Sequence, residues 1–566
     1  MKMGSLSNIF IRRFFWKGTI VVLAFDFLSL YSQPQGVLPA NADSVAIIPR
    51  QALRAHVEFL GDDALEGRGT GTRGGERAAQ YLAAECARLG LQPMGEDGGF
   101  LQAIPMHGSR PLPQSRLQIV TKSGETTLSL NKDYLLYHSG AQTFVPKPVP
   151  LVFVGYGITA PEYDYNDYQT MEVEGKIVVF LSGEPASEDK NYFAGETQTL
   201  YAFPAYKQMM AIARGARGSI MIPLPREERG RTWDYWARQF AFEDVTLLSS
   251  ATNNLSILLN PATARVLFED AAFSLQEVFD LDAQHAMRSF SLKTSASFRG
   301  VFQQRDFLAH NLIGGWEGSD SALKDSYVLL TAHYDHLGVG TAVQGDSIYN
   351  GVFDNAIGVA AVLEIARALT ALSGRPRRSL LFLFLTGEEK GLLGSNYYVE
   401  HPIVPLHRTI ANINVDGLAL FDTFNDVAAV GAEFSSLQES LQQVAAALGL
   451  RLSAVPDYFT GTQPFARSDQ VVFAQAGIPS LLVMEGLDYR HTSKEEGWQR
   501  FLQWGEQFYH APADDLHQPL NFAAAQQHAQ LLFALSYELA NGLRAPEWKP
   551  DTPFIHARLQ TLAEKR

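Results

Sequence analysis

The stretch Leu380-Leu-Phe-Leu-Phe-Leu-Thr-Gly-Glu-Glu389 decides the fold of this 566-residue chain. Six apolar residues bounded by a turn signal are typical of a strand buried on both faces. Similar runs and helix-like segments follow in turn on either side of it. Strands are predicted at 327–331, 380–385, 410–415 and 480–483, and helices at 358–372 and 437–448. This alternation predicts an α/β domain whose sheet carries helices on both faces.

Acidic or imidazole side chains follow each of these predicted strands. The residues concerned are His333, Asp335, His336, Asp354, Glu388, Glu389, Asp416, His510, Asp514 and Asp515. In open α/β sheets, binding groups gather beyond the carboxyl ends of the strands. Carboxylates packed into one crevice repel one another unless a cation neutralises them. The pattern therefore predicts a metal site, and the single cysteine, Cys86, restricts its ligands to His, Asp and Glu.

The ligand set suits two zinc ions, although the native metal is left open. Two histidines and three carboxylates, one of them bridging, would supply three protein ligands to each ion. The adjacent Glu388 and Glu389 can point differently, so one can ligate while the other faces a water molecule. Paired metals lower the pKa of that water and polarise a carbonyl, and one carboxylate must take and return a proton.

Composition and the N-terminal segment limit the remaining functions. The net charge is 46 − 60 = −14 without a basic block, which argues against nucleic acid as a partner. Residues 1–42 combine basic residues, an apolar run and Ala40-Asn-Ala42, which predicts a cleaved export signal or, alternatively, a retained anchor. No later apolar run is long enough to span a membrane, so a periplasmic or secreted bacterial protein is expected.

The length suggests several structural units. Residues 43–145 are expected to form an N-terminal part of the main domain, and 146–300 a β-rich insert with strands at 151–154 and 176–180. Residues 301–566 carry the predicted metal ligands and are expected to form the catalytic domain.

Several motifs, in this order, resemble metallopeptidase family 28, the co-catalytic di-zinc aminopeptidases of the aminopeptidase Y and bacterial leucyl aminopeptidase type. They are His333-Tyr-Asp-His-Leu-Gly338, Asn350-Gly-Val-Phe-Asp-Asn355, Gly387-Glu-Glu-Lys-Gly-Leu-Leu-Gly-Ser395, Asn414-Val-Asp416, Arg467-Ser-Asp-Gln-Val-Val-Phe473 and Tyr509-His510. Glu66-Gly-Arg-Gly-Thr-Gly71 resembles the N-terminal strip of the family. The resemblance implies a zinc-exopeptidase-like mixed sheet flanked by helices, with 146–300 as an inserted protease-associated domain.

The resemblance also implies a role for each site residue. It places His333, Asp354 and Asp416 on one zinc and Asp354, Glu389 and His510 on the other, with Asp354 as the bridge. Glu388 would be the general base, Asp335 would orient the His333 imidazole, and Tyr509 would stabilise the oxyanion. Phe353 departs from the family pattern, in which an acidic residue is common before the bridging Asp.

Some residues admit other interpretations. His491 competes with His510 for the last ligand position, and His510 is preferred because of its Tyr-His-x-Pro context. His336 is interpreted as a structural loop histidine, and Glu364 as lying on a solvated helix surface. Asp469, with Ser468 before it, is either a helix cap or part of a pocket lining.

The function predicted from the resemblance is an exported metallo-aminopeptidase acting on peptides. Alternatives on the same fold are a carboxypeptidase, a glutaminyl cyclase with a single catalytic zinc, and a non-catalytic receptor-like ectodomain. Retention of His333 and Asp416 argues against the cyclase. The filled ligand positions argue against the ectodomain. The acidic balance favours recognition of an amine, and assembly into a homodimer is left open. No G-x-S-x-G elbow follows a predicted strand, so a serine hydrolase is not expected.

Overall fold

The computed structural model describes residues 48–138, 143–195, 198–226, 232–419, 421–456 and 464–563. The predicted export signal at 1–42 lies outside the described residues. Within the described part of the chain, no helix combines the length and the apolar character that crossing a bilayer requires.

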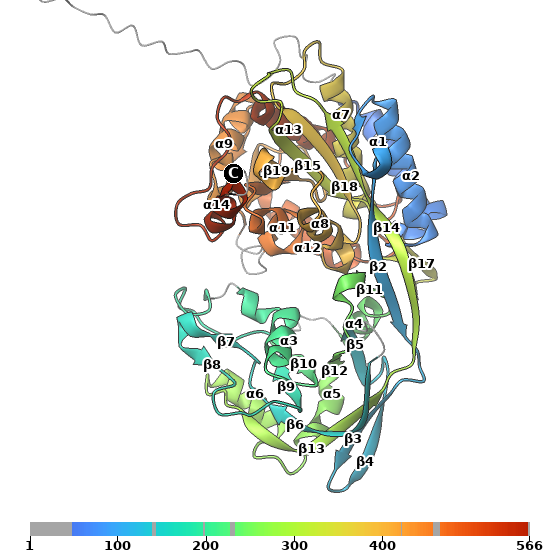
Figure 1. The fold of residues 1–566 in the computed structure, drawn as a ribbon, viewed down its shortest axis with the longest axis vertical. Coiled ribbons are helices and arrows are strands. Elements are labelled where there is room, and N and C mark those ends of the chain that lie inside the picture. Colours follow the sequence, from blue (N-terminus) through green and yellow to red (C-terminus); the bar gives the residue numbers. More distant parts are fainter. Residues whose placement is uncertain are drawn as a thin grey trace, which may run out of the picture. The chain divides into compact units, whose positions relative to one another are not determined.

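The first of two large sheets has ten strands among the described residues, in the order β11-β2-β14-β18-β15-β19-β22-β20-β21, with β1 paired to β14. Figure 1 shows β2 and β14 as long neighbouring strands at one side of this sheet. Its strands are β1 (Gln92–Pro93), β2 (Leu101–Pro111), β11 (Asp244–Leu247), β14 (Phe302–Trp316), β15 (Tyr327–His333), β18 (Ser379–Leu385), β19 (Thr409–Asn414), β20 (Asp426–Val430), β21 (Arg451–Leu452) and β22 (Ser480–Glu485).

The centre of this sheet is parallel, as its apolar strands predict. β15 lies between β18 and β19, and Thr331 is aligned with both Leu383 and Asn414. β22 continues the parallel set beside β19, whereas β14 runs antiparallel to β18. The carboxyl ends of β18, β15, β19 and β22 therefore meet at one edge, and the predicted mixed α/β fold class is confirmed.

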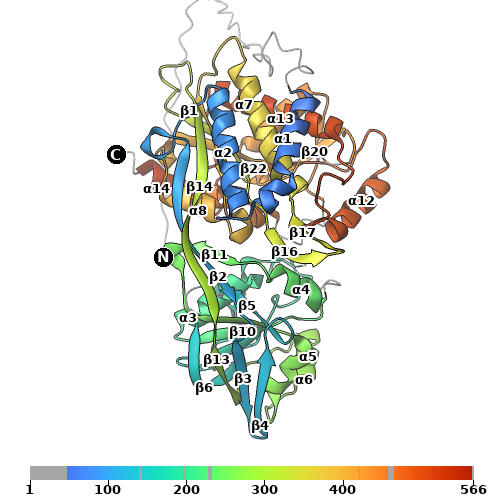
Figure 2. The ribbon, with the colours of Figure 1, turned by 90° about the vertical axis from the view of Figure 1, so that its right-hand side faces the viewer.

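Helices cover both faces of the sheet because successive strand residues point to opposite sides. Leu330 belongs to the core under α1, α2, α7, α9 and α13, whereas Leu329 packs with Tyr398 of α8 and Phe473 of α11. The first group, partly seen in Figure 2, comprises α1 (Arg50–Leu60), α2 (Arg73–Arg88), α7 (Ile357–Thr370), α9 (Leu437–Ala447) and α13 (Phe522–Asn541). The second comprises α8 (Leu393–Glu400) and α11 (Gln470–Gln475).

The sequence-based placement of Glu364 on a solvated surface is wrong. α7 packs against α1 and α13, so Glu364 is 1% exposed. Its carboxylate lies 3.4 Å from the Nε2 atom of His56 and accepts a hydrogen bond from Arg367 at 2.7 Å. The partner from α1 is distant in sequence, so helical periodicity alone could not reveal this pairing.

The second sheet has eight strands within the described residues, in the order β4-β3-β13-β6-β9-β10-β12-β5. They are β3 (Arg116–Thr121), β4 (Gly124–Ser129), β5 (Tyr134–His138), β6 (Phe144–Phe153), β9 (Ile177–Leu181), β10 (Gly218–Ile222), β12 (Leu255–Leu259) and β13 (Phe290–Arg299). The sheet thus begins before residue 146, and a boundary at that residue would divide it. The short hairpin β3–β4 is rich in polar residues, so its sequence does not stand out as a strand pair.

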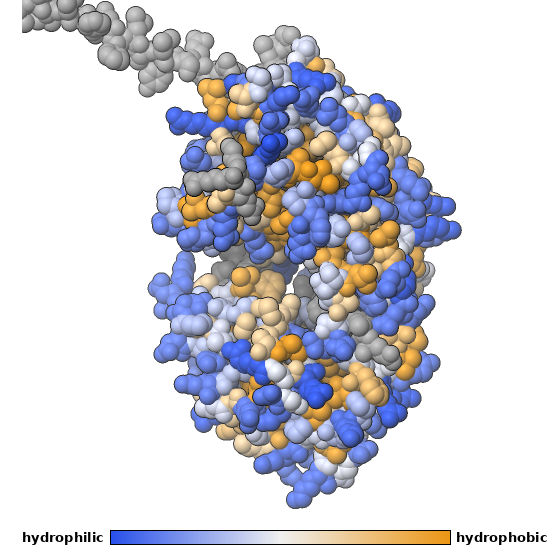
Figure 3. Space-filling view, viewed as in Figure 1, coloured by the Kyte–Doolittle hydropathy of each residue, from blue (hydrophilic) through white to orange (hydrophobic). Residues whose placement is uncertain are grey.

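The described residues form further helices and strands besides those of the two sheets and the helices that cover the first one. They are α3 (Pro204–Ala213), α4 (Trp233–Gln239), α5 (Pro261–Ala264), α6 (Leu275–Ala283), α12 (Lys494–Gln507), α14 (Ile555–Ala563), β7 (Thr159–Ala160), β8 (Tyr165–Asn166), β16 (Gly338–Val343) and β17 (Asp346–Tyr349). The space-filling view shows hydrophilic and hydrophobic residues interspersed over the visible face (Figure 3).

We expect Phe382→Ala to destabilise the protein by about 3–5 kcal/mol, because it leaves a cavity in a close-packed core. Phe382 lies in the middle of β18 and is fully buried. The matched control is Phe144→Ala in the second sheet, where the side chain is 55% exposed and removal should cost less than about 0.5 kcal/mol. Guanidinium unfolding midpoints measure both effects. Equal midpoints for the two variants would contradict the placement of Phe382 in the core.

Candidate metal centre

Three parallel strands deliver polar side chains to the same edge of the first sheet. His333 is the last residue of β15, and Asp416 follows β19. After β18 the chain turns at Gly387 into the short helix η8 (Glu388–Lys390). Because the strands are parallel neighbours, these side chains lie together despite their separation in sequence.

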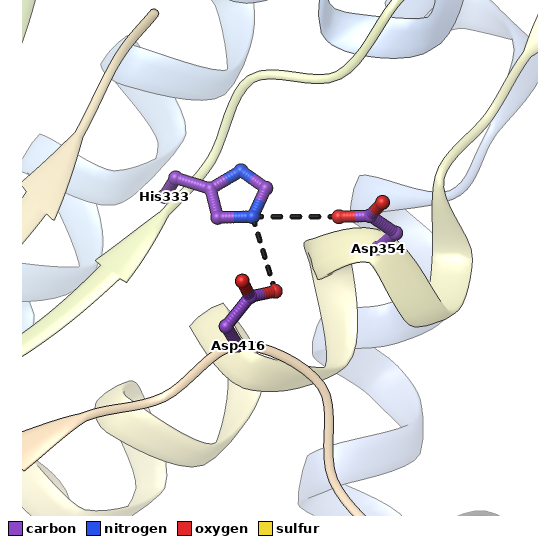
Figure 4. A group of neighbouring side chains, drawn as sticks. All are labelled: His333, Asp354 and Asp416. Atoms are coloured by element: carbon purple, nitrogen blue, oxygen red, sulfur yellow. Dashed lines mark hydrogen bonds and ion pairs between the residues drawn. The ribbon is translucent and has the colours of Figure 1, made fainter. Parts of the chain in front are cut away.

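A first group consists of His333, Asp354 and Asp416. The Nε2 atom of His333 lies 3.4 Å from Asp354 Oδ1 and 3.3 Å from Asp416 Oδ1. Figure 4 shows the two carboxylates converging on this one nitrogen, His333 from a strand end and Asp354 from the turn η7 (Val352–Ala356). The Nδ1 atom of His333 is 3.1 Å from the backbone oxygen of Asp335. A proton on Nδ1 would be donated to that oxygen, leaving the Nε2 lone pair directed at the carboxylates.

A second group forms on the other side of Asp354. The Nε2 atom of His510 lies 3.4 Å from Asp354 Oδ2 and 3.2 Å from Glu389 Oε2. The two carboxylate oxygens of Asp354 therefore face different histidines. This is the arrangement that a bridging carboxylate would need.

His336 lies closer to this second group than a loop histidine with only a structural role would need to. Its Nδ1 atom is 2.7 Å from Glu389 Oε1 and 4.0 Å from Asp354 Oδ2. With Asp354 and Glu389 it forms one of the two groups of three that, among the residues the structure describes, have atoms close enough together to hold an ion. His336 contacts the Glu389 oxygen that His510 does not.

The electrostatics of the cluster call for a cation. Burial raises the pKa of Glu388 well above its usual range, and Asp416 and Glu389 add to the rise, although His333 opposes it. Four carboxylates, those of Asp354, Asp416, Glu388 and Glu389, share this edge of the sheet. Histidine nitrogens and carboxylate oxygens are ligands that zinc prefers. The donor set therefore fits zinc.

The Asp335 side chain does not contact His333 in the way the resemblance implies. Its Oδ1 atom is 3.9 Å from the His333 Nδ1 atom, and the backbone oxygen of Asp335 is the closer acceptor. The buried carboxylate instead accepts hydrogen bonds from the Glu388 amide at 3.2 Å and from the Thr70 hydroxyl at 2.8 Å. Asp335 thus ties the strip before α2 to the turn that carries Glu388.

Tyr509 and His491 occupy different surroundings. The Tyr509 ring stacks on the His510 ring with centroids 3.9 Å apart, which places the phenol beside the second group. His491 bonds to Asp422 at 3.0 Å, and its side chain is 76% exposed. His491 is therefore not brought to the cluster, whereas His510 is.

Sequence reasoning missed the residue that supports the backbone at Asp354. The fully buried carboxylate of Asp514 accepts hydrogen bonds from the amides of Phe353 at 2.8 Å and Asp354 at 3.1 Å. Phe353 packs edge-on against Trp504 of α12, with ring centroids 4.6 Å apart. The acidic pair Asp514-Asp515 after Tyr509-His510 is evident in the sequence. The sequence does not show that Asp514 bonds to the backbone at Phe353 and Asp354.

Asp469 is also buried near the cluster. It precedes α11 without capping it through its side chain. The Ser395 hydroxyl donates to Asp469 at 2.6 Å, and burial raises the Asp469 pKa to about 7 although His333 and Ser395 lower it. Ser468 accepts a hydrogen bond from Asn414 at 2.8 Å. The helix-cap interpretation of the Asp469 side chain is therefore wrong.

Comparison with known proteins agrees with the geometry. Residues 311–536, which contain the two groups and Glu388, match the model of Peptidase family M28, and this confirms the resemblance drawn from the motifs. The chain is 27% identical over 254 residues to leupeptin-inactivating enzyme 1 of Streptomyces exfoliatus, a match covering 44% of this chain and 52% of the relative. It is 28% identical over 276 residues to the "probable leucine aminopeptidase 2" of Aspergillus oryzae, covering 46% of this chain and 50% of the relative.

The chain thus spans about half the length of these curated relatives. Among solved structures, the aminopeptidase from Aneurinibacillus sp. strain AM-1 superposes with a TM-score of 0.53 at 17% identity. The superposition covers 89% of this chain and 96% of that chain, and it supports the fold.

Proposed function

Because residues 311–536 belong to peptidase family M28, we propose that the protein is a zinc-dependent aminopeptidase that removes N-terminal residues from peptides. The observation that carries this proposal is the position of Asp354, whose two carboxylate oxygens each lie 3.4 Å from a different histidine. A carboxylate so placed can bridge two cations. The names of the relatives favour cleavage from the amino end.

The proposed ligands divide between two zinc ions. One ion would be held by His333, Asp354 and Asp416, and the other by Asp354, Glu389 and His510. The second assignment is supported by the 3.2 Å approach of His510 to the Glu389 oxygen that His336 leaves free. His336 would then be an outer partner that fixes the orientation of Glu389.

Bound zinc would polarise the carbonyl of the scissile peptide and lower the pKa of the attacking water. As general base, Glu388 would take a proton from the attacking water and deliver it to the leaving amine nitrogen. The Glu388 amide is anchored on the Asp335 carboxylate, which fixes the turn and hence the base. Tyr509 would donate its phenolic proton to the developing oxyanion, a role supported by the stacking of its ring on that of His510.

Recognition of a free amino group fits the charges around the site better than recognition of a carboxylate. The chain carries 60 acidic against 46 basic residues and the site is rich in carboxylates, so the potential there favours a positively charged amine over a carboxylate. A carboxypeptidase would instead need a cation aimed at its substrate. This contrast favours the aminopeptidase over the carboxypeptidase.

The test uses aminoacyl and carboxyl-terminal reporter peptides, with and without chelator. We expect cleavage from the amino end alone, complete loss after dialysis against chelator, and recovery on adding zinc. A glutaminyl cyclase would release no amino acid but would close N-terminal glutamine. Chelator-resistant cleavage, or cleavage from the carboxyl end only, would contradict the proposal.

Other proposals concern the rest of the chain. The basic and apolar pattern of 1–42 supports export, and hence a periplasmic or secreted enzyme. The eight-stranded second sheet supports an inserted β-rich domain of the protease-associated kind. Assembly into a homodimer stays a prediction.

A further inference from the structure

A guanidinium lies fully buried behind the candidate metal centre. Arg68 is 0% exposed, and its nitrogens donate four hydrogen bonds, all to backbone oxygens. Nε donates to Tyr334 at 2.7 Å, Nη1 to Leu60 and Asn350 at 2.6 Å each, and Nη2 to Gly351 at 2.7 Å. One planar group thus links the end of α1 with two separate loops.

Both loops carry proposed zinc ligands. Tyr334 stands between His333 and Asp335, so its carbonyl fixes the backbone that follows β15. Asn350 and Gly351 lead directly into the turn η7, which holds Asp354. The guanidinium therefore sets the spacing between the ends of two ligand-bearing segments. A fork of rigid N–H donors suits this task better than a flexible ammonium.

The residues after Arg68 extend the same contact. The Thr70 hydroxyl donates to the Asp335 carboxylate at 2.8 Å, and the other oxygen of Asp335 accepts the Glu388 amide at 3.2 Å. Gly69 forms a bridge with His336 between their backbones. The strip Arg68–Thr70 thus contacts the loops of two proposed ligands, His333 and Asp354, and is linked to His336 and, through Asp335, to the proposed base.

Arg68 also carries a charge that suits its position. Among the described residues, no carboxylate lies within ion-pair distance of the guanidinium. The positive charge of Arg68 is therefore not paired with a single neighbouring carboxylate. Burial lowers the pKa of Arg68 to about 10, although four neighbouring carboxylates raise it, and the group stays charged at neutral pH. These carboxylates belong to Asp514, Asp335, Asp354 and Glu389. A fixed cation behind them reduces their mutual repulsion.

We propose that Arg68 and Thr70 are positioning residues of the metal centre, which hold the loops of His333, Asp354 and Glu388 at the spacing that zinc requires. This inference rests on the proposed function, because it assumes that the cluster binds zinc. Neither residue touches the substrate or the ion. They hold these loops in the binding geometry in the metal-free protein.

The experiment measures zinc binding to the metal-stripped full-length protein by calorimetric titration. Outer partners of metal ligands typically change metal affinity by about 10–100-fold, so Arg68→Met is expected to weaken zinc binding at least about tenfold. Arg378→Met is the matched control. Arg378 is 2% exposed and donates to the backbone oxygens of Leu539, Gly542 and Leu543, but it precedes β18 at the opposite end of the strand from Glu388. Arg378→Met should destabilise the fold and leave the zinc affinity unchanged.

Each outcome decides a separate question. A wild-type protein that takes up no zinc would overturn the proposed function. Wild-type binding together with unchanged affinity in Arg68→Met, or an equal loss in Arg378→Met, would overturn the positioning role alone. Arg68→Lys keeps a positive charge but cannot make the four hydrogen bonds of the planar fork, so it should also weaken zinc binding, and wild-type affinity in Arg68→Lys would overturn the role of the fork.

A milder variant covers the case in which Arg68→Met does not fold. Thr70→Val preserves shape and removes only the hydroxyl that donates to Asp335. We expect a lower zinc affinity in a metal-free protein that still folds, with its melting temperature lowered by only a few degrees because the buried Asp335 carboxylate loses one hydrogen bond. Unchanged zinc affinity in Thr70→Val would overturn the positioning role of this strip.

Discussion

Glu388→Gln is expected to lower kcat by about 10²–10⁴-fold, the usual contribution of a general acid–base group, while the protein keeps its zinc. Glutamine has nearly the same shape but cannot take a proton from water. Glu388 is proposed as the base and not as a ligand, since the two metal groups are complete without it. Its backbone amide would still bond to Asp335, so the turn should survive the exchange.

The measurement pairs turnover of an aminoacyl reporter with metal analysis of the same sample. Glu400→Gln serves as the control, because Glu400 lies exposed at the end of α8 in the same part of the chain. Its kcat should match that of the wild type. If Glu388→Gln retained its zinc and turned over substrate at a wild-type rate, the role proposed for Glu388 would be wrong.

The sheet centre was predictable because it follows from local composition. The run 380–385 is apolar throughout, and only a strand buried on both faces explains it. The antiparallel strands β2 and β14 were not predicted. β14 begins with polar residues at 303–306 and pairs along its length with a segment about two hundred residues earlier, so neither its pattern nor its partner is a local property.

Part of the candidate site could likewise be predicted from the sequence, and part could not. His333, Asp354 and Asp416 stand directly beyond strands or before a helix, where their chemistry can be read in sequence. Arg68 gave no such signal, because its partners are backbone carbonyls that any residue provides. The pairing of Glu364 with His56 was hidden for the same reason, since it depends on which helices pack together.

The interpretation of His336 shows a further limit. Sequence motifs separate ligands from other histidines only by position, and His336 lies within the same short motif as His333. The structure distinguishes its contact by atom: Nδ1 meets one oxygen of Glu389 while His510 meets the other. The spacing of residues along the sequence cannot show that two imidazoles contact different oxygens of one carboxylate.

Asp354→Ala is expected to remove both zinc ions and to reduce kcat/KM by on the order of 10³ or more, because metal-assisted hydrolysis needs the ions that this residue shares. The alanine side chain offers no oxygen to either group. His333 and His510 would each lose the partner that lies 3.4 Å away. Asp416→Ala removes a ligand from the first group only, so that variant should keep one zinc.

Metal analysis after purification without chelator distinguishes these cases by counting zinc per chain. Asp346→Ala, at an exposed position of the hairpin β16–β17, should retain the wild-type content. The graded result, two ions lost for Asp354 and one for Asp416, follows only if a single carboxylate serves both groups. Equal zinc loss in the two variants would show that Asp354 is an ordinary ligand, and the bridged arrangement would have to be abandoned.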